Sequence, residues 1–327
     1  MNDTLKKALK IIVPISIGMY LTWYFLSGLS EKDIRETKHA IEHANYFWAF
    51  LGLLVTFLSH FSRAYRSLFL FEPLGYKPKL KNVYHGVMAG YVINYTLPRS
   101  GEFARASLLA KYEKIPFEKG FGTIVVERVI DAMVFGLIFL ITGLLRINSG
   151  NIDAITNSGE SSSNWTIYIL LVFPVIGSVG LFFYFKNEKF KRFVKEKFLG
   201  FYQGIKSIWT MKKKWAFIAH TFFIWGAYIG ALWLFALSFP QTAGIGIDTV
   251  FGIFLVSAVA VGLLPGGIGA YPVWVTKVLA LDGVHFAALG IFAWGAQTLA
   301  IVALGLLSLF LIQRQPREEP EQNEVEI

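Results

Sequence analysis

Long apolar stretches without any charged residue dominate the pattern along this chain. Several are about as long as the ~20 residues that an α-helix needs to cross the roughly 30 Å of a bilayer's hydrocarbon core. The apolar residues run on continuously instead of alternating with polar ones, which argues against a transmembrane β-barrel. The pattern predicts an all-α polytopic membrane protein with about six full spans. The charge-free stretches are 11–30, 43–62, 82–98, 132–145, 161–185, 215–247, 249–276 and 283–313.

Composition strengthens this interpretation. Hydrophobic residues make up 54% of the 327 positions and charged residues only 16%, and 30 Phe, 14 Tyr and 9 Trp are more than one aqueous core can hide. The chain has no cysteine, which excludes disulfides, thiolate nucleophiles and cysteine-ligated metals. A net charge of +9 is compatible with nucleic acid, but cytoplasmic loops explain it better in a membrane chain. We therefore expect membrane lipids as partners, no nucleic acid and no cofactor.

The distribution of Lys and Arg predicts which loops face the cytoplasm. Three lysines precede the first apolar run, and its length favours an uncleaved first span over a signal peptide. Ten Lys or Arg place 186–214 inside, and the apolar residues of this segment follow one helical face, as in a helix lying on an anionic leaflet. Residues 147–163 and 239–248 hold no Lys or Arg and belong outside. These loops predict a multi-pass protein of the inner (cytoplasmic) membrane with both termini in the cytoplasm.

One apolar run does not fit a simple crossing. Residues 82–98 lie between 63–81 and 99–119, which each carry five basic residues and are both expected inside. The conflict disappears if the run enters the membrane and returns through a second helix at 100–113. We therefore predict a re-entrant or paired hairpin with its turn at Pro98, in protein or beside a water-filled cavity, where irregular backbone is tolerated.

The second half of the chain repeats this arrangement. Pro98 and Pro265 both follow a leucine and lie 167 residues apart, and the same shift relates the run at 120–145 to that at 287–312. Each half then reads as span, span, hairpin, span. Three crossings per half invert the second half relative to the first, and paired interrupted segments of this kind indicate the central site of a transporter. The alternative is that Leu-Pro recurs by chance.

We therefore predict two inverted-topology repeats. The first covers 1–146 and the second 164–313, with an extracytoplasmic loop at 147–163 between them. The tail at 314–327 is rich in Pro and Glu and is expected to be disordered. The residues assigned to the two hairpin turns are Asn94, Pro98, Pro265, Gly266, Gly267 and Gly269.

Three charged residues interrupt the predicted span at 118–146. Glu127 lies about 13 Å along this helix, close to the middle of the bilayer, and Asp131 shares its face. Arg128 points about 100° away, so we expect it to need a partner on another helix. Each charge costs ~2.5–3.5 kcal/mol at a helix centre before pairing. The residues either fix the packing as an ion network or line a pathway, and the cost favours a pathway.

The first hairpin supplies the predicted anion site. A helix that begins near Ser100 directs free N–H groups at the turn, and helix N-termini bind phosphate. Arginine side chains there suit phosphate oxygens, although an interfacial anchor is an equal alternative for Arg105. Glu102 is expected to hold Arg105 or Arg128. The predicted headgroup ligands are Arg99, Gly101, Arg105 and Arg128, and the orienting or proton-coupling carboxylates are Glu102, Glu127 and Asp131.

Other polar residues carry weaker signals. His60, Arg63 and Arg66 end the second predicted span, and we interpret them as a cytoplasmic anchor. His220 is interpreted as structural, and Lys277 as a residue that extends toward the membrane interface.

At the hairpin and span motifs the chain resembles a known family, the lysylphosphatidylglycerol synthase transmembrane region, whose members are flippase-like integral membrane proteins. The resemblance implies a polytopic membrane domain that moves or handles anionic or isoprenoid-linked lipids. It rests on three motifs: Asn94…Pro98-Arg99-x-Gly101-Glu102-x-x-Arg105, Glu127-Arg128-x-x-Asp131, and Leu264-Pro265-Gly266-Gly267-Ile268-Gly269.

Two departures from the family change what the resemblance implies. Only a short tail follows residue 313, so the soluble aminoacyl-transferase domain of the related synthases is missing and we expect no synthase activity. The glycine-rich third motif is often followed by Glu in the family, whereas Pro272 stands there in this chain. If that carboxylate shapes the headgroup site, the ligand of this chain differs.

Three functions are compatible with the sequence. The leading one is a lipid translocase that holds the phosphate of an anionic phospholipid or isoprenoid-linked lipid among its arginines. The second is a secondary transporter for a small soluble anion. The third is an intramembrane lipid-modifying enzyme in which Glu127 and Asp131 hold Mg²⁺, although Arg128 opposes a cation and no metalloprotease or serine-hydrolase motif occurs.

Overall fold

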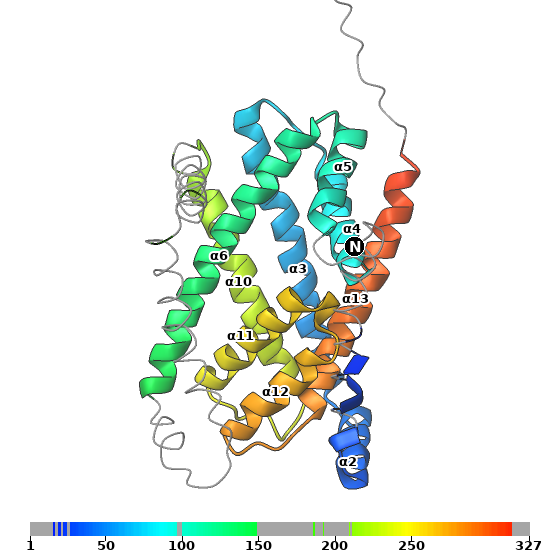
Figure 1. Ribbon diagram of the computed structural model, residues 1–327, viewed down its shortest axis with the longest axis vertical. Coiled ribbons are helices and arrows are strands. Elements are labelled where there is room, and N and C mark those ends of the chain that lie inside the picture. Colours follow the sequence, from blue (N-terminus) through cyan, green and yellow to red (C-terminus); the bar gives the residue numbers. More distant parts are fainter. Residues whose placement is uncertain are drawn as a thin grey trace, which may run out of the picture. The chain divides into compact units, whose positions relative to one another are not determined.

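The computed structural model describes residues 27–96, 100–148 and 211–315, with scattered residues in 16–24 and 186–209. Every regular element in these residues is a helix, which confirms the predicted all-α class (Figure 1). Two short 3₁₀ helices accompany the α-helices, at Glu72–Leu74 and Pro265–Gly267. The α-helices are α2 (Glu31–Glu42), α3 (Tyr46–Phe71), α4 (Leu80–Thr96), α5 (Gly101–Glu113), α6 (Phe117–Asn148), α10 (Lys214–Leu237), α11 (Ile247–Leu263), α12 (Ala270–Leu281) and α13 (Ala288–Gln313).

Three of the described helices are long and apolar enough to cross a membrane. They are α3 with its short extension to Leu74, α10 and α13. Helix α6 runs without interruption for 32 residues and contains the predicted charged span at 118–146. The predicted span at 161–185 lies outside the described residues, as do most of the basic segment 186–214 and half of the predicted span at 11–30.

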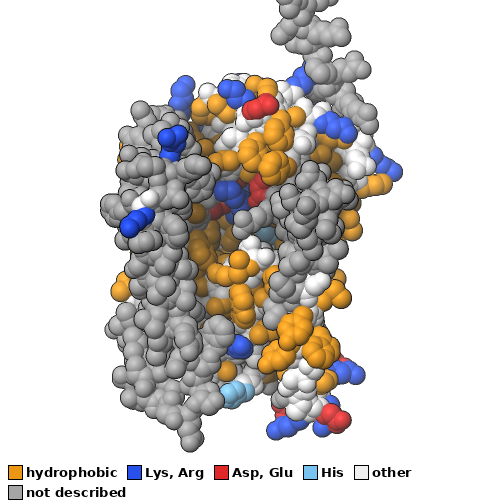
Figure 2. Space-filling model, viewed as in Figure 1, with side chains coloured by type: hydrophobic (Ala, Val, Ile, Leu, Met, Phe, Trp, Pro, Cys, Tyr) orange, Lys and Arg blue, Asp and Glu red, His pale blue; other side chains and the backbone are white. Residues whose placement is uncertain are grey.

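Helix α3 carries its polar face inside and its apolar face outside. Leu54, Phe57 and Phe61 follow each other at helical spacing, and each is more than a third exposed. A helix of a water-soluble protein shows the opposite arrangement, so the outer face of α3 suits lipid. In Figure 2 hydrophobic side chains cover much of the described surface between α2 and α5, and a few charged side chains are also visible there. The buried polar side chains of α3 are Thr56, Ser59, His60, Ser62, Arg63, Arg66 and Ser67.

A lysine in place of Leu54 is expected to reduce the amount of membrane-integrated protein. Leu54 is exposed within the first half of α3, and a lysine at the centre of a transmembrane helix costs ~2.5–3.5 kcal/mol. Carbonate extraction followed by gel filtration in detergent measures the effect. Leu74→Lys is the control, because an exposed lysine at the end of the span reaches the interface. Equal levels of the two variants would contradict a lipid-facing α3.

The chain forms two helical hairpins, α4 with α5 and α11 with α12 (Figure 1). Helices α4 and α11 each contain 17 residues, and a shift of 167 residues carries the bounds of α4 onto those of α11. The first turn, at 97–99, lies outside the described residues, and with it Pro98 and Arg99. The second turn contains three glycines with positive φ, at 58° for Gly266, 72° for Gly267 and 74° for Gly269. Residues with side chains rarely adopt this conformation, which explains the glycine-rich motif.

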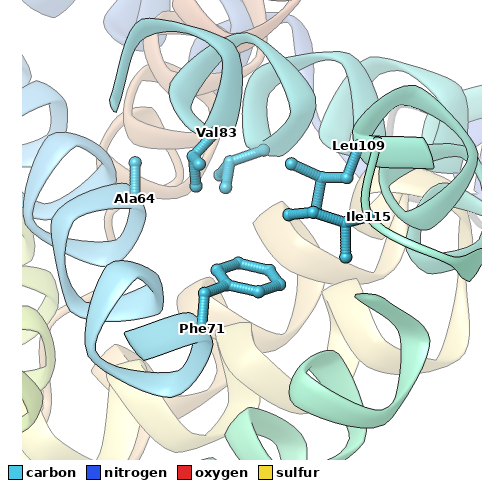
Figure 3. Close-up of a cluster of buried hydrophobic side chains, with 6 residues drawn as sticks. Ala64, Phe71, Val83, Leu109 and Ile115 are labelled. Carbon is cyan, nitrogen blue, oxygen red and sulfur yellow. The ribbon is translucent and has the colours of Figure 1, made fainter. Parts of the chain in front are cut away.

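The hairpins pack against the long helices. Helix α3 packs along α10 and α4, and α13 packs along α4 and α12. A buried apolar cluster joins α3 and α4 to α5 and the segment that follows it (Figure 3). Its members include Ala64, Phe71, Val83, Leu109 and Ile115. The cluster fixes the first hairpin against α3, which carries the buried polar residues.

The chain divides into two compact units. One comprises 1–127 and 213–327, and the other comprises 128–212. The boundary falls within α6, directly before Arg128. The predicted repeats at 1–146 and 164–313 describe a different division, based on sequence order, and they stay a prediction.

Candidate functional site

A side-chain amide holds the start of α5. The N–H of Gly101 donates to Oδ1 of Asn94 at 2.7 Å, and the N-cap residue Ser100 forms no side-chain cap. A Cβ atom on Gly101 would overlap the carbonyl oxygen of Gly90, so α4 and α5 meet where neither glycine has room for a side chain. The structure thus brings two predicted residues together, but Asn94 occupies the N–H group that the sequence assigns to an anion.

Arg105 and Glu127 form a buried ion pair between α5 and α6. Nη1 of Arg105 lies 2.9 Å from Oε2 of Glu127, and Nη2 lies 2.8 Å from Oε1. Ser67 of α3 accepts a hydrogen bond from Arg105 and donates one to Glu127 at 2.7 Å. The side chains of Arg105 and Glu127 are 5% and 0% exposed. The network therefore joins three helices away from solvent.

This ion pair corrects two predictions for Arg105. Glu127 holds the guanidinium group, and Glu102 does not, because Glu102 lies half-buried in the first turn of α5 outside this network. The interfacial-anchor alternative is also wrong, because an anchor would place its charge at the membrane surface and Arg105 is buried. Two parallel hydrogen bonds between a carboxylate and a guanidinium group are among the stronger polar contacts in proteins.

Arg128 pairs within its own helix. Its Nη2 lies 3.3 Å from Oδ2 of Asp131, three residues further along α6. The expectation of a partner on another helix is wrong, since residues three apart are neighbours on a helix surface. Arg128 is 43% exposed and Asp131 only 9%. Both belong to the 128–212 unit, so this pair is described separately from the network around Arg105.

Two arginines of α3 are buried, and sequence reasoning misplaced them. Helix α3 continues to Phe71, so Arg63 and Arg66 lie inside it, at 4% and 0% exposure, and do not form a cytoplasmic anchor. Nη1 of Arg66 donates to Oγ1 of Thr221 on α10 at 3.0 Å. The guanidinium group of Arg63 lies 6.0 Å from the ring centre of Tyr228. The sequence did contain a signal for their burial, because polar residues recur every three or four positions along α3 and so share one face of the helix.

The two hairpins meet at the second turn. A Cβ atom on Gly266 would overlap the ring of Tyr95, which lies near the end of α4. Nε1 of Trp294 donates to the carbonyl oxygen of Gly266 at 2.8 Å, and the hydroxyl of Tyr95 lies 3.3 Å from Oγ1 of Thr298. Pro265, Gly266 and Gly267 are buried. The second turn thus packs against the first hairpin and against α13.

Within the described residues, no three or more His, Asp or Glu side chains form a group that could hold a metal ion. Two described carboxylates of the candidate site contact arginines, Glu127 with Arg105 and Asp131 with Arg128. These contacts suit charge-assisted hydrogen bonding to an anion better than coordination of a cation.

Comparisons with known proteins agree with these motifs. The family model of the lysylphosphatidylglycerol synthase TM region matches residues 11–308. A UPF0104 membrane protein of Methanocaldococcus jannaschii is 34% identical over 96 residues, which span 28% of this chain and 29% of that protein. No solved structure matches. The family match concerns the membrane region alone, and no synthase catalytic domain was found.

The family model spans most of the chain, including both hairpins and the charged residues of α6. The described helices include three that are long and apolar enough to cross a membrane. This chain is therefore an integral membrane protein that belongs to the lysylphosphatidylglycerol synthase TM region family.

Proposed function

We propose that this protein is a flippase-like translocase for an anionic phospholipid or an isoprenoid-linked lipid. The observation that carries the proposal is the burial of Arg63, Arg66 and Arg105 in helices of a membrane protein. Each buried charge costs several kcal/mol, and ionisable residues at membrane depth usually serve a substrate or ion pathway. The lipid's phosphate would lie at the arginines while its chains stay in the bilayer.

The contacts at α5 support an exchange mechanism for the headgroup. Glu127 and Asn94 occupy the groups of Arg105 and Gly101 that a phosphate would use. An arriving phosphate would displace Glu127 from Arg105, and protonation of Glu127 would assist its release. In this proposal Glu127 is the coupling carboxylate. The other proposed roles are headgroup binding for Arg99 and Arg128 and orientation of arginines for Glu102 and Asp131.

We also propose the inverted-repeat arrangement, with six full spans and one hairpin entering from each side. Helices α4 and α11 support it, because they begin and end at positions 167 residues apart. A side-chain hydrogen bond at an equivalent place in each hairpin also supports it. Nδ2 of Asn82 donates to Glu113 in the first, and Oγ1 of Thr249 donates to Oδ2 of Asp282 at 2.6 Å in the second. A shift of 167 residues carries Asn82 onto Thr249. Such repeats bind substrate at their interface near the membrane midplane.

Single cysteines are expected to label from opposite sides of the membrane. The chain has no native cysteine, so each introduced thiol reports its own position. We expect Ser107→Cys to react with an impermeant maleimide only after the cytoplasmic side is opened, and Glu36→Cys and Gln241→Cys to react in intact cells. All three positions are exposed. Labelling of Ser107→Cys in intact cells would contradict the proposed topology.

Leaflet exchange in liposomes tests the function. The wild-type protein is reconstituted with fluorescent phosphatidylglycerol or a fluorescent polyprenyl phosphate, and dithionite then bleaches the label that is in the outer leaflet. We expect exchange of at least one of these lipids, and a loss of about tenfold or more in its rate for Arg128→Ala. Lys119→Ala is the matched control, because Lys119 is an exposed basic residue of the same helix. Folded protein that exchanges neither lipid would overturn the proposal.

A further inference from the structure

His60 is a buried histidine of α3 whose ring nitrogens are unsatisfied. Its side chain is 6% exposed, and neither Nδ1 nor Nε2 has a hydrogen-bond partner in the part of the chain that the structure describes. The imidazole ring instead lies between two aromatic rings, 4.9 Å from that of Tyr91 on α4 and 5.9 Å from that of Tyr228 on α10. Helices α3, α4 and α10 thus surround the imidazole ring, and none of their described residues forms a hydrogen bond with it.

Such a group is unusual in a folded protein. Most buried polar side-chain atoms have a hydrogen-bond partner, and an unsatisfied one calls for an explanation such as a binding role. Phenylalanine would fill a comparable volume without any polar atom, so packing between tyrosine rings does not explain a histidine here. A nearby histidine shows the usual arrangement, because Nδ1 of His220 lies 2.7 Å from Oγ of Ser62.

The neighbours of His60 indicate which ligand its nitrogens would bind. Arg63 and Ser67 follow on the same face of α3, Arg63 is buried beside Tyr228, and Ser67 contacts the Arg105–Glu127 pair. A stripe of donors that begins at His60 and continues to Arg105 suits an anion with several oxygens. Phosphate esters fit, because they accept hydrogen bonds from imidazole and guanidinium groups alike.

We propose that His60 and Arg63 form a binding site for the phosphate of an anionic lipid headgroup, covered in this structure by Tyr91 and Tyr228. This inference rests on the function proposed above and adds a site on α3 to the residues at the α5 turn. The two tyrosine rings close the site, so the headgroup enters when α4 or α10 moves away from α3.

Nitrogen-15 NMR of the full-length protein tests the site directly. The protein carries labelled histidine in nanodiscs of phosphatidylcholine, or of equal parts phosphatidylcholine and phosphatidylglycerol. With six histidines in the chain, the His60 signal is assigned by substituting the other five. We expect the His60 nitrogen signals to move only in discs with phosphatidylglycerol. An unchanged His60 signal overturns the proposal. A third sample, phosphatidylcholine discs with glycerol 3-phosphate in solution, separates the two phosphate sources, and a response there alone overturns the lipid assignment.

Lipid binding by variants gives a second measurement. We expect His60→Phe to weaken binding of phosphatidylglycerol, followed by native mass spectrometry, by about ten- to a hundredfold. Its thermal stability should be unchanged or higher, because the unsatisfied nitrogens are gone. His220→Phe is the matched control and should bind lipid as the wild type does. Wild-type affinity in folded His60→Phe overturns the proposal, and if this variant does not fold, the NMR result decides.

The two proposals fail in different ways. Leaflet exchange by the wild-type protein with an unchanged His60 signal would reject the α3 site and keep the translocase. A moving His60 signal without leaflet exchange would keep the site and reject the translocase.

Discussion

Glu127→Ala is expected to destabilise the folded protein by about 3–5 kcal/mol, which is the usual cost of removing one partner of a buried ion pair. Glu127 is fully buried, and both of its carboxylate oxygens accept hydrogen bonds from Arg105. Without it, the buried guanidinium group keeps its desolvation cost and loses the charge that offsets it. Ser67 loses one of its two acceptors and keeps the carbonyl oxygen of Arg63. Thermal unfolding in detergent, followed by gel filtration, measures the loss.

Two comparisons separate the ion pair from a general effect of substitution. Glu118→Ala removes an exposed carboxylate from the first turn of the same helix and should change stability by less than about 0.5 kcal/mol. The double variant Arg105→Met with Glu127→Leu should recover much of the lost stability, because apolar side chains can replace a buried ion pair. A Glu127→Ala protein as stable as the wild type would show that the pair does not hold α5 to α6.

Gly101→Ala is expected to have a comparable effect through packing, at about 3 kcal/mol or more, the upper end of the cost of overpacking. The new methyl group would overlap the carbonyl oxygen of Gly90 and lie 2.8 Å from Cγ of Asn94. The clash involves backbone, so no side-chain rotation relieves it. Helices α4 and α5 would have to separate, and the bond from Gly101 to Asn94 would break.

Gly122→Ala is the matched control for this substitution. Gly122 lies in a helix, and a Cβ atom there would meet no atom within 4 Å. Alanine in place of an exposed helical glycine stabilises by about 0.5–1 kcal/mol. The unfolding temperature should therefore fall for Gly101→Ala and rise for Gly122→Ala. A Gly101→Ala protein that unfolds at or above the wild-type temperature would contradict the close approach of α4 and α5.

The helices were predictable because apolar length and proline position carry most of that information. The 167-residue shift relates the two Leu-Pro motifs, and it also relates the observed bounds of α4 and α11. The end of α3 was not predictable from apolar length alone. Arg63 and Arg66 end the apolar run, but the helix continues through them because both side chains point inward. A count of Lys and Arg cannot distinguish a basic loop at the membrane surface from basic side chains buried within a helix bundle.

The sequence predicted which residues belong to the candidate site, but not which of them contact each other. Asn94, Gly101, Arg105 and Glu127 all lie in the motifs. The hydrogen bond from Gly101 to Asn94 and the ion pair of Arg105 depend on how hairpin and span pack, which a single sequence does not contain. The interpretation of His60 as part of a cytoplasmic anchor was wrong, because His60 is buried within α3. The ring nitrogens of His60 have no hydrogen-bond partner in the described residues. A sequence alone cannot predict that a buried side chain will lack such a partner.

The fit of Tyr95 against Gly266 makes the two hairpins mechanically dependent on each other. The ring occupies the space where any other residue at 266 would place its side chain. Trp294 and Thr298 of α13 fix the turn and the tyrosine from the same helix. A hinge motion of either hairpin must therefore slide this ring across the glycine backbone or carry the opposite hairpin with it. In the proposed translocase, this aromatic contact would then couple opening on one side of the bilayer to closing on the other.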